Sequence, residues 1–361
     1  MRKQILTAAV MTAIAGMSIA AQADESTTVG GKAYIDFTSK TVKNTSGSKV
    51  DPSGIGFDLT RFYLSVSHNF DDMWSANLTT DVNYAADCGT YITGVNFGAQ
   101  TTTSSKCKPA DIQLYVKKAY LQAKFSDAAV VRAGSADMPW IPYVEHAYGY
   151  RYVEKTLIDR TGFGTSADWG AHVGGKVGMV NYAVSAVNGN GYKHPDRSKS
   201  MDFEARVGVM PVKGLNVALG FYDGKLGMNT YANANATPPV TVLTGKRMDA
   251  LVAYSQDMFN VGAEYVSAKD WKTSTSDKAA GYSVFGSVKA GSSAAVFARY
   301  DTLKPNKTTV PGLKDTYYNV GVSYEARKNV DLALAYKNEK MKNTGSEAKT
   351  SEIGVWTQVK F

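Results

Sequence analysis

The sequence has no long hydrophobic run beyond its first two dozen residues. Apolar side chains make up 44% of the chain, yet they never form a continuous stretch of ten after residue 23. A membrane-spanning helix needs about 20 apolar residues in a row, so such a helix is excluded there. The chain also lacks a Pro-rich or Ser-rich stretch that would mark a linker, which favours a single domain over residues 24–361.

Clusters of like charge are also missing. Lysine and arginine are scattered in ones and twos without a Lys/Arg-rich run, so nucleic acid is not an expected partner. Without Arg2 and Lys3, which lie in the leader described next, 38 basic residues face 32 acidic ones, and the net charge is +6. A charge of this size favours a slight preference for anions.

The first 23 residues are organised as an export signal. A basic start, Met1 to Lys3, precedes the apolar segment 5–21, and Ala21-Gln22-Ala23 is a small-x-small cleavage site. This order predicts a signal peptide over residues 1–23 that is removed on export. The alternative, a transmembrane helix, is disfavoured because the apolar run is too short and a polar stretch follows it.

Cysteine is rare. The only two, Cys88 and Cys107, lie in one polar, turn-rich segment. Because an exported chain meets an oxidising compartment, we expect a disulfide between them, with two free thiols as the alternative. No histidine lies near them, and two thiolates make a poor metal site, so we expect neither a metal nor a cofactor.

What the sequence does have is a repeated two-residue period. In segment 57–70, apolar Phe62, Leu64 and Val66 alternate with polar side chains that include Arg61 and Ser65. Such alternation indicates strands with one apolar and one polar face. About sixteen strands are predicted, at 29–39, 57–70, 73–85, 112–125, 128–137, 168–178, 180–188, 200–211, 214–225, 246–256, 258–268, 280–290, 293–303, 315–326, 329–340 and 349–361.

The connections between these strands alternate in length. Long connections are predicted at 40–56, 86–111, 138–167, 189–199, 226–245, 269–279, 304–314 and 341–348, with short turns between them. This sorting places each class at its own end of the sheet. It predicts an all-β fold, a transmembrane antiparallel up-and-down β-barrel in the bacterial outer membrane, with short periplasmic turns and long extracellular loops.

The polar face of the strands should line the interior. A spanning sheet must close on itself and turn its apolar face to lipid, because lipid offers no hydrogen bonds. Inward charges would then need water, and a ring of sixteen strands is wide enough to leave an aqueous channel. The predicted wall residues are Arg61, Asp81, Lys118, Arg132, Lys176, Arg206 and Arg299.

The connection 138–167 is the longest, and it is unusually rich in aromatic and charged residues. If it folds inward it would narrow the channel, where rings of charged side chains decide which ions pass. The alternative is packing over the barrel mouth or against a neighbouring subunit. The predicted constriction residues are Glu145, Arg151, Glu154, Lys155, Asp159 and Arg160.

Part of the sequence resembles a known family. The segments 118–121, 131–134 and 160–162, together with Glu154 and the Gly174-Gly175 strand, resemble the phosphate-selective porin O and P superfamily over roughly 112–178. The resemblance implies a sixteen-stranded channel, usually a trimer, with an inward third loop and basic residues along its path. Where that family has a base near the start of the loop, this chain has the acid Asp137.

These observations predict a porin, a water-filled channel for passive diffusion of small hydrophilic solutes and inorganic ions, with a mild anion preference. A channel selective for phosphate or a sugar is the nearest alternative. An outer-membrane hydrolase is a more distant one, because it would need a serine paired with a histidine and an acid, and only His146 and His172 are placed to serve. A structural or adhesive barrel would show a plug or passenger domain, and neither is visible.

Overall fold

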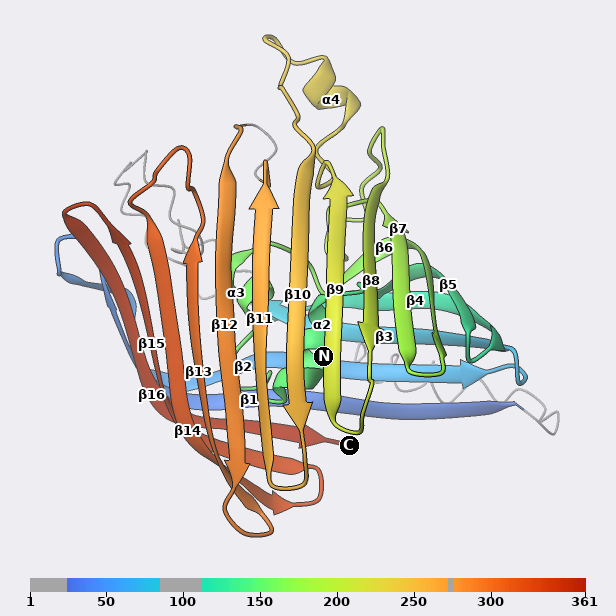
Figure 1. Ribbon diagram of the computed structural model, residues 1–361, viewed down its shortest axis with the longest axis horizontal. Coiled ribbons are helices and arrows are strands. Elements are labelled where there is room, and N and C mark those ends of the chain that lie inside the picture. Colours follow the sequence, from blue (N-terminus) through green and yellow to red (C-terminus); the bar gives the residue numbers. More distant parts are fainter. Residues whose placement is uncertain (1–24, 85–111, 272–274) are drawn as a thin grey trace, which may run out of the picture.

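Sixteen antiparallel strands close into one barrel (Figure 1). The computed structural model describes residues 25–84, 112–271 and 275–361. Each strand in these ranges pairs with its neighbour in sequence, and β1 (Ser26–Lys43) closes the ring against β16 (Ser346–Lys360). The predicted up-and-down barrel is therefore confirmed.

The remaining elements follow in chain order. The strands are β2 (Lys49–Asn69), β3 (Trp74–Tyr84), β4 (Ile112–Ser126), β5 (Ala129–Asp137), β6 (Ala167–Val177), β7 (Val180–Val187), β8 (Asp202–Val209), β9 (Leu215–Gly224), β10 (Gly245–Ser255), β11 (Phe259–Lys269), β12 (Lys278–Lys289), β13 (Ala294–Lys304), β14 (Lys314–Arg327) and β15 (Val330–Asn343). The helices are α2 (Ile141–Tyr148), α3 (Leu157–Thr161) and α4 (Tyr231–Ala234). None of the helices in the described ranges is long and apolar enough to cross a membrane.

The connections are sorted as the sequence predicts. Those at one end of the barrel, here called the turn end, have five residues or fewer, and most at the opposite, loop end are longer. Two predicted long loops, 40–56 and 341–348, are wrong. The pairing of β1 with β2 continues to Lys43 and Lys49, so their connection is short. The pairing of β15 with β16 likewise continues to Asn343 and Ser346. Polar sequence there marks the end of the apolar face and not the end of the hydrogen-bonded ladder.

Side chains alternate between the two faces of the wall. Outward positions carry exposed apolar residues such as Leu219, Val252 and Leu334. Inward positions carry charged and polar residues such as Glu264 and Arg299, and both of these are buried. The inward charges therefore lie against other protein groups over part of the wall, which alternation alone does not reveal.

Several register irregularities lie between β1 and β5, and two of them, both β-bulges, change which residues face the interior. In β2, Thr60 is the extra residue, because Tyr34 pairs with Arg61 and Ile35 with Leu59. In β4, Lys117 is the extra residue, because Thr79 pairs with Lys118 and Thr80 with Val116. A bulge shifts the inward-facing parity by one residue, so neighbouring residues of one strand can both face the interior.

Candidate functional site

The connection from β5 to β6 leaves the wall and fills part of the barrel interior (Figure 1). This segment, residues 138–166, is called the inward loop below. Its helix α2 has a proline in its first turn, which suits helix starts, and it ends at Gly149 with a φ of 81°. Helix α3 ends in the same way at Gly162. The loop is therefore an ordered pair of short helices.

Trp140 fixes the loop to the wall just before α2. Its side chain is fully buried, its backbone N–H donates to Glu204 at 2.8 Å, and its indole N–H donates to Glu264 at 2.8 Å. The ring lies over Gly220, where a Cβ would come within 2.5 Å of it. Glycine at 220 is thus required for this approach.

An apolar core joins the loop to strands β9 to β13. It contains Trp140, Ile141, Val144, Tyr148, Leu157, Ile158 and Phe163 from the loop, with Ala218, Leu251, Ala253, Val266, Ala268, Ala279, Phe285 and Leu303 from the wall. Burial of this much apolar surface stabilises the loop in one position. The loop therefore packs directly against this part of the wall.

Buried ion pairs complete the attachment. Arg160 of α3 contacts Asp301 at 3.3 Å, Asp315 at 2.8 Å and Glu339 at 2.6 Å. Burial alone would lower the pKa of Arg160, but these three carboxylates raise it above its ordinary value. Arg299 contacts Asp301 at 2.6 Å and donates to the backbone oxygen of Lys155 at 2.5 Å. Both arginines, which the sequence predicts to line the channel, hold the loop against the wall, and Arg160 also lines a cavity of about 270 Å³.

Glu154 makes a further link at the edge of this region. Its carboxylate lies 3.3 Å from Lys337, which also contacts Glu352 at 2.8 Å and the ring of Trp356. Burial raises the pKa of Glu154, but Lys337 and Arg160 outweigh it and lower the pKa to about 2. Glu154 therefore keeps its charge over the whole neutral range.

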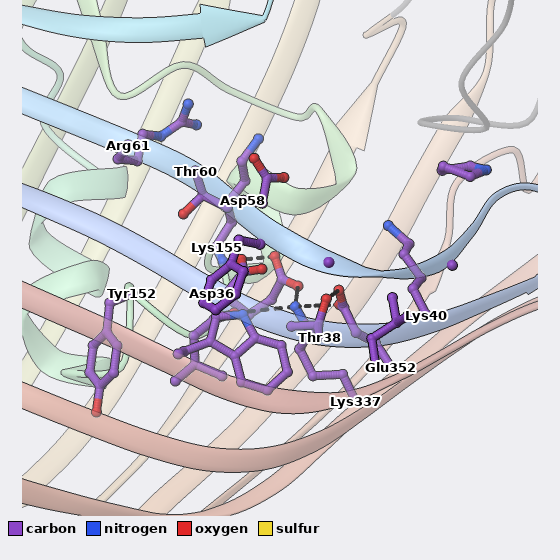
Figure 2. A pocket seen from close by; sticks show the side chains of 18 of the residues that line it. Asp36, Thr38, Lys40, Asp58, Thr60, Arg61, Tyr152, Lys155, Lys337 and Glu352 are labelled. Atoms are coloured by element: carbon purple, nitrogen blue, oxygen red, sulfur yellow. Dashed lines mark hydrogen bonds and ion pairs between the residues drawn. The ribbon is translucent and has the colours of Figure 1, made fainter.

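The opposite side of the barrel interior is open. A cavity of about 690 Å³ lies between the inward loop and strands β1 and β2, towards the loop end (Figure 2). Figure 2 shows Asp36 and Lys40 from β1 and Asp58 and Arg61 from β2 around this space, with Lys155 from the loop. We call it the loop-end cavity. Lys40, Lys155 and Asp58 have no ion pair within the described part of the chain, so their charges are available to a solute, whereas the side chain of Asp36 is buried.

A second cavity, of about 340 Å³, lies towards the turn end. We call it the turn-end cavity. Its charged lining residues are Lys32, Lys117, Lys118, Arg151, Asp137 and Glu145. Lys118 is neutralised by Asp137 at 2.5 Å, whereas Lys117 lies over the Tyr63 ring at 4.6 Å and has no acidic partner among the described residues. The free charge of this cavity is therefore positive.

Arg151 of the inward loop lines both cavities. Its guanidinium is held by Glu145 at 2.5 Å and by Asp159 at 3.3 Å. Burial alone would lower its pKa, but these two carboxylates raise it above the ordinary value, so Arg151 stays charged. Arg151 therefore marks the level at which the two cavities meet.

The predicted constriction residues thus divide into two groups. Arg151, Glu154 and Lys155 line the loop-end cavity, and Glu145 joins Arg151 in the turn-end cavity. Asp159 positions Arg151, and Arg160, the sixth, lies in the buried ion-pair cluster.

The predicted wall residues also divide. Arg61 lines the loop-end cavity and lies 3.8 Å from the buried Asp81, while Lys118 lines the turn-end cavity. The other four line neither of these two cavities: Arg132 donates to Gln122, Arg206 stacks on Tyr143, Lys176 lies near the turn end, and Arg299 is buried. Cys88 and Cys107 lie outside the described residues.

Sequence reasoning missed Lys117 and Thr60. Alternation assigns both to the outward face, and only the two bulges bring them inside. A lysine pair such as 117 and 118 in an otherwise alternating strand was the available signal.

One histidine has a serine beside it. His172 Nδ1 lies 2.8 Å from Ser185 Oγ, but both side chains are buried and neither lines a described cavity. Nε2 of His172 has no hydrogen-bond partner among the described residues, so no acid completes a catalytic triad there.

Comparison with known proteins gives a consistent result. A family model described as Gram-negative porin matches residues 7–344. Among solved structures, the anion-selective porin of Comamonas acidovorans aligns with a TM-score of 0.61 at 12% identity, over 94% of this chain and 100% of that one. The outer membrane channel DcaP of Acinetobacter baumannii aligns with a TM-score of 0.60 at 11% identity, over 95% and 99%.

The trimer form of OmpT, an outer membrane protein of Vibrio cholerae, aligns with a TM-score of 0.56 at 13% identity, over 94% of this chain and 100% of that one. At these identities the structural likeness establishes the fold. A search of curated proteins finds no match.

Proposed function

Because this chain belongs to the Gram-negative porin family and forms a channel for passive diffusion in the bacterial outer membrane, we propose that solutes cross it between the inward loop and strands β1 to β4. The single observation that carries this proposal is the pair of polar cavities that meet at Arg151. One opens towards the extracellular loops and the other towards the periplasmic turns. The apolar core of the loop fills the interior next to strands β9 to β13.

The constriction of this path lies at Arg151 and its surroundings. Arg61 approaches from β2, and Tyr34 and Tyr63 stack edge to face beside it, with ring centroids 6.0 Å apart. Charged groups at a narrow point decide which ions enter, because a low local dielectric strengthens their field. Residues 138–167 therefore act as the constriction loop, with Arg151 as its central charge.

The channel prefers small anions. The cations without acidic partners form a series along the path. Lys40 and Lys155 lie on the loop-end side of Arg151, and Lys117 and Lys32 lie on its turn-end side. The unpaired acids Asp36 and Asp58 lie only in the loop-end cavity, which makes the preference mild. The anion-selective porin among the structural neighbours is consistent with this assignment.

The assembled form is a homotrimer. One structural neighbour is a trimer, and the outward face of β3 and β4 carries a continuous apolar surface, with Leu78, Leu114 and Leu121 all strongly exposed. Residues 1–23 serve as the cleaved signal peptide that brings the chain to the outer membrane.

The test is single-channel recording of the full mature chain in a planar bilayer with a salt gradient. Wild-type protein is expected to give ohmic steps with a reversal potential on the anion side. Arg151→Gln leaves Glu145 and Asp159 without their cation, so the reversal potential should move clearly towards cations.

The matched control is Arg132→Gln, which removes the same charge from an inward residue outside both cavities. Its reversal potential should stay at the wild-type value. An absence of steps from folded protein would overturn the proposed path, and an equal shift in both variants would show that solutes do not pass preferentially beside Arg151.

A further inference from the structure

We propose that the outer surface of the barrel at its loop end binds the phosphate groups of anionic lipids in the outer leaflet, through a collar of lysines. Nine adjacent strands, β10 to β16, β1 and β2, carry lysines near their loop ends, and the alternation of the strands puts these lysines on the outward face. This lysine collar consists of Lys246, Lys269, Lys278, Lys304, Lys314, Lys340, Lys342, Lys349, Lys43 and Lys49.

The strand register places these lysines directly opposite one another. Lys269 of β11 lies between Lys246 of β10 and Lys278 of β12. Lys314 of β14 faces Lys342 of β15. A further row runs across four strands, from Lys340 to Lys349, Lys43 and Lys49. Like charges directly opposite each other destabilise a sheet, so these rows favour an anion that lies across them.

A row of outward tyrosines fixes the height of the collar. Tyr265, Tyr282, Tyr300, Tyr318 and Tyr336 each lie four residues from a collar lysine on the same strand. Cross-strand neighbours such as Tyr282 and Tyr300 are in contact, with ring centroids 6.4 Å apart. Tyrosine belts mark the boundary between hydrocarbon and headgroups.

Four residues of strand cover about 13 Å. Because four is an even number, each lysine shares the outward face of its tyrosine. The collar therefore lies beyond the hydrocarbon boundary, in the layer that lipid phosphates occupy.

Few acids neutralise the collar. Lys246 contacts Asp223 at 3.2 Å, Lys269 contacts Asp270 at 3.9 Å, and Lys340 contacts Glu347 at 3.9 Å. The other seven lysines have no ion pair within the ranges that the structure describes. Exposed pairs of this kind are weak, so the collar remains strongly positive.

The distribution points to lipid as the partner. The lysines lie in cross-strand rows along nine neighbouring strands, which suits a lipid leaflet, and as a set they do not converge on one pocket, although Lys43 and Lys349 also contribute to the lining of a cavity of about 270 Å³ at the loop end. In the described residues, strands β3 to β9 have no lysine at this level of the outward face. That sector includes β3 and β4, where the proposed trimer contact lies.

The experiment is native mass spectrometry of the full mature chain, purified in detergent and incubated with lipid A that carries two phosphates. Lys304, Lys314 and Lys349 are among the collar lysines that make no ion pair in the described ranges, and K304Q/K314Q/K349Q should lower the retained lipid at least fivefold. The matched control, K213Q/K289Q/K328Q, removes three exposed lysines from the turn end and should retain lipid as the wild type does. Heat-modified gel migration checks that both variants form closed barrels.

Two further arms identify the ligand. Lipid A from which the phosphates have been removed should bind at the background level of K304Q/K314Q/K349Q. Inorganic phosphate at millimolar concentration should leave the bound lipid in place. Equal retention by both triple variants, equal binding of phosphate-free lipid, or displacement by inorganic phosphate would each overturn the proposal.

Discussion

At the scale of single residues, Glu154 ties the stability of the inward loop to pH. Its pKa is lowered to about 2 from an ordinary value of 4.5. A carboxylate with a depressed pKa stabilises the folded state above its ordinary pKa, and this contribution disappears as the pH falls towards the depressed value. The shift corresponds to about 3 kcal/mol at neutral pH.

We therefore expect Glu154→Gln to lower the free energy of unfolding by about 3 kcal/mol at pH 7. The difference from wild type should be constant down to about pH 5 and should shrink between about pH 4.5 and pH 2. Guanidinium unfolding in detergent micelles, followed by tryptophan fluorescence, measures it. Glu325→Gln, at an exposed carboxylate near the turn end, should show no such gap, and a gap for Glu154→Gln that persists below pH 2 would contradict the assignment.

Single residues also show how far the two-residue alternation of the sequence predicts which side chains face the interior. Parity assigns Arg61, Lys118 and Arg299 correctly to the inward face, because alternation holds wherever the ladder is regular. The alternation does not reveal that Arg299 and Arg160 both form ion pairs with Asp301, because these ion pairs depend on where the inward loop packs. Nor does it find Lys117, whose orientation depends on one extra residue in β4.

At the scale of elements, the position of the inward loop depends on the close contact between the Trp140 ring and Gly220 of β9. Gly220 of β9 leaves room for the Trp140 ring, and a Cβ there would come within 2.5 Å of it. Gly220→Ala should displace the ring, weaken the hydrogen bonds of Trp140 to Glu204 and Glu264, and destabilise the protein by about 1–3 kcal/mol.

Trypsin provides the measurement, because Arg151, Lys155 and Arg160 are cleavage sites within the loop. Gly220→Ala should make these sites cut faster in folded protein. Gly54→Ala is the matched control, since a Cβ at Gly54 meets nothing within 4 Å. If both variants resist trypsin like the wild type, Trp140 does not hold the loop in place.

The strands could be predicted from the sequence and the loop structure could not. Strand boundaries follow the apolar and polar alternation, which the lipid and the lumen impose together. The helices α2 and α3 are too short to show a clear helical period, and they are ordered by contacts with Leu251, Phe285 and Leu303, which are distant in sequence. The excess length of β1 and β2 was missed because their paired ends are mostly polar and carry only a few apolar residues, such as Val42 and Val50.

At the scale of the whole molecule, the outer surface divides into two sectors. The sector from β10 to β2 carries the lysine collar, and the sector from β3 to β9 lacks it in the described residues. The positive charge of the first sector is complementary to anionic lipid headgroups, whereas a row of lysines would not favour contact with a neighbouring subunit. The proposed trimer contact therefore belongs to the second sector, on β3 and β4.

Leu114 and Leu334 allow a direct test of this division, because they are matched in type and in exposure, at 62% and 59%. Leu114 lies on β4 in the collar-free sector, and Leu334 lies on β15 beneath the collar. A lysine on a surface that faces lipid costs up to about 2–4 kcal/mol, depending on depth, but leaves the oligomer intact. At a threefold contact, the same lysine brings three like charges into an apolar interface and separates the subunits.

Light scattering coupled to size-exclusion chromatography in detergent should thus find trimers for the wild type and Leu334→Lys, and monomers for Leu114→Lys. In planar bilayers, conductance steps that come in threes should become single steps of unchanged size in Leu114→Lys, because each barrel has its own path beside Arg151. Trimers that survive Leu114→Lys but fall apart in Leu334→Lys would place the subunit contact beneath the collar. The lysine row would then have to meet a neighbouring subunit instead of lipid.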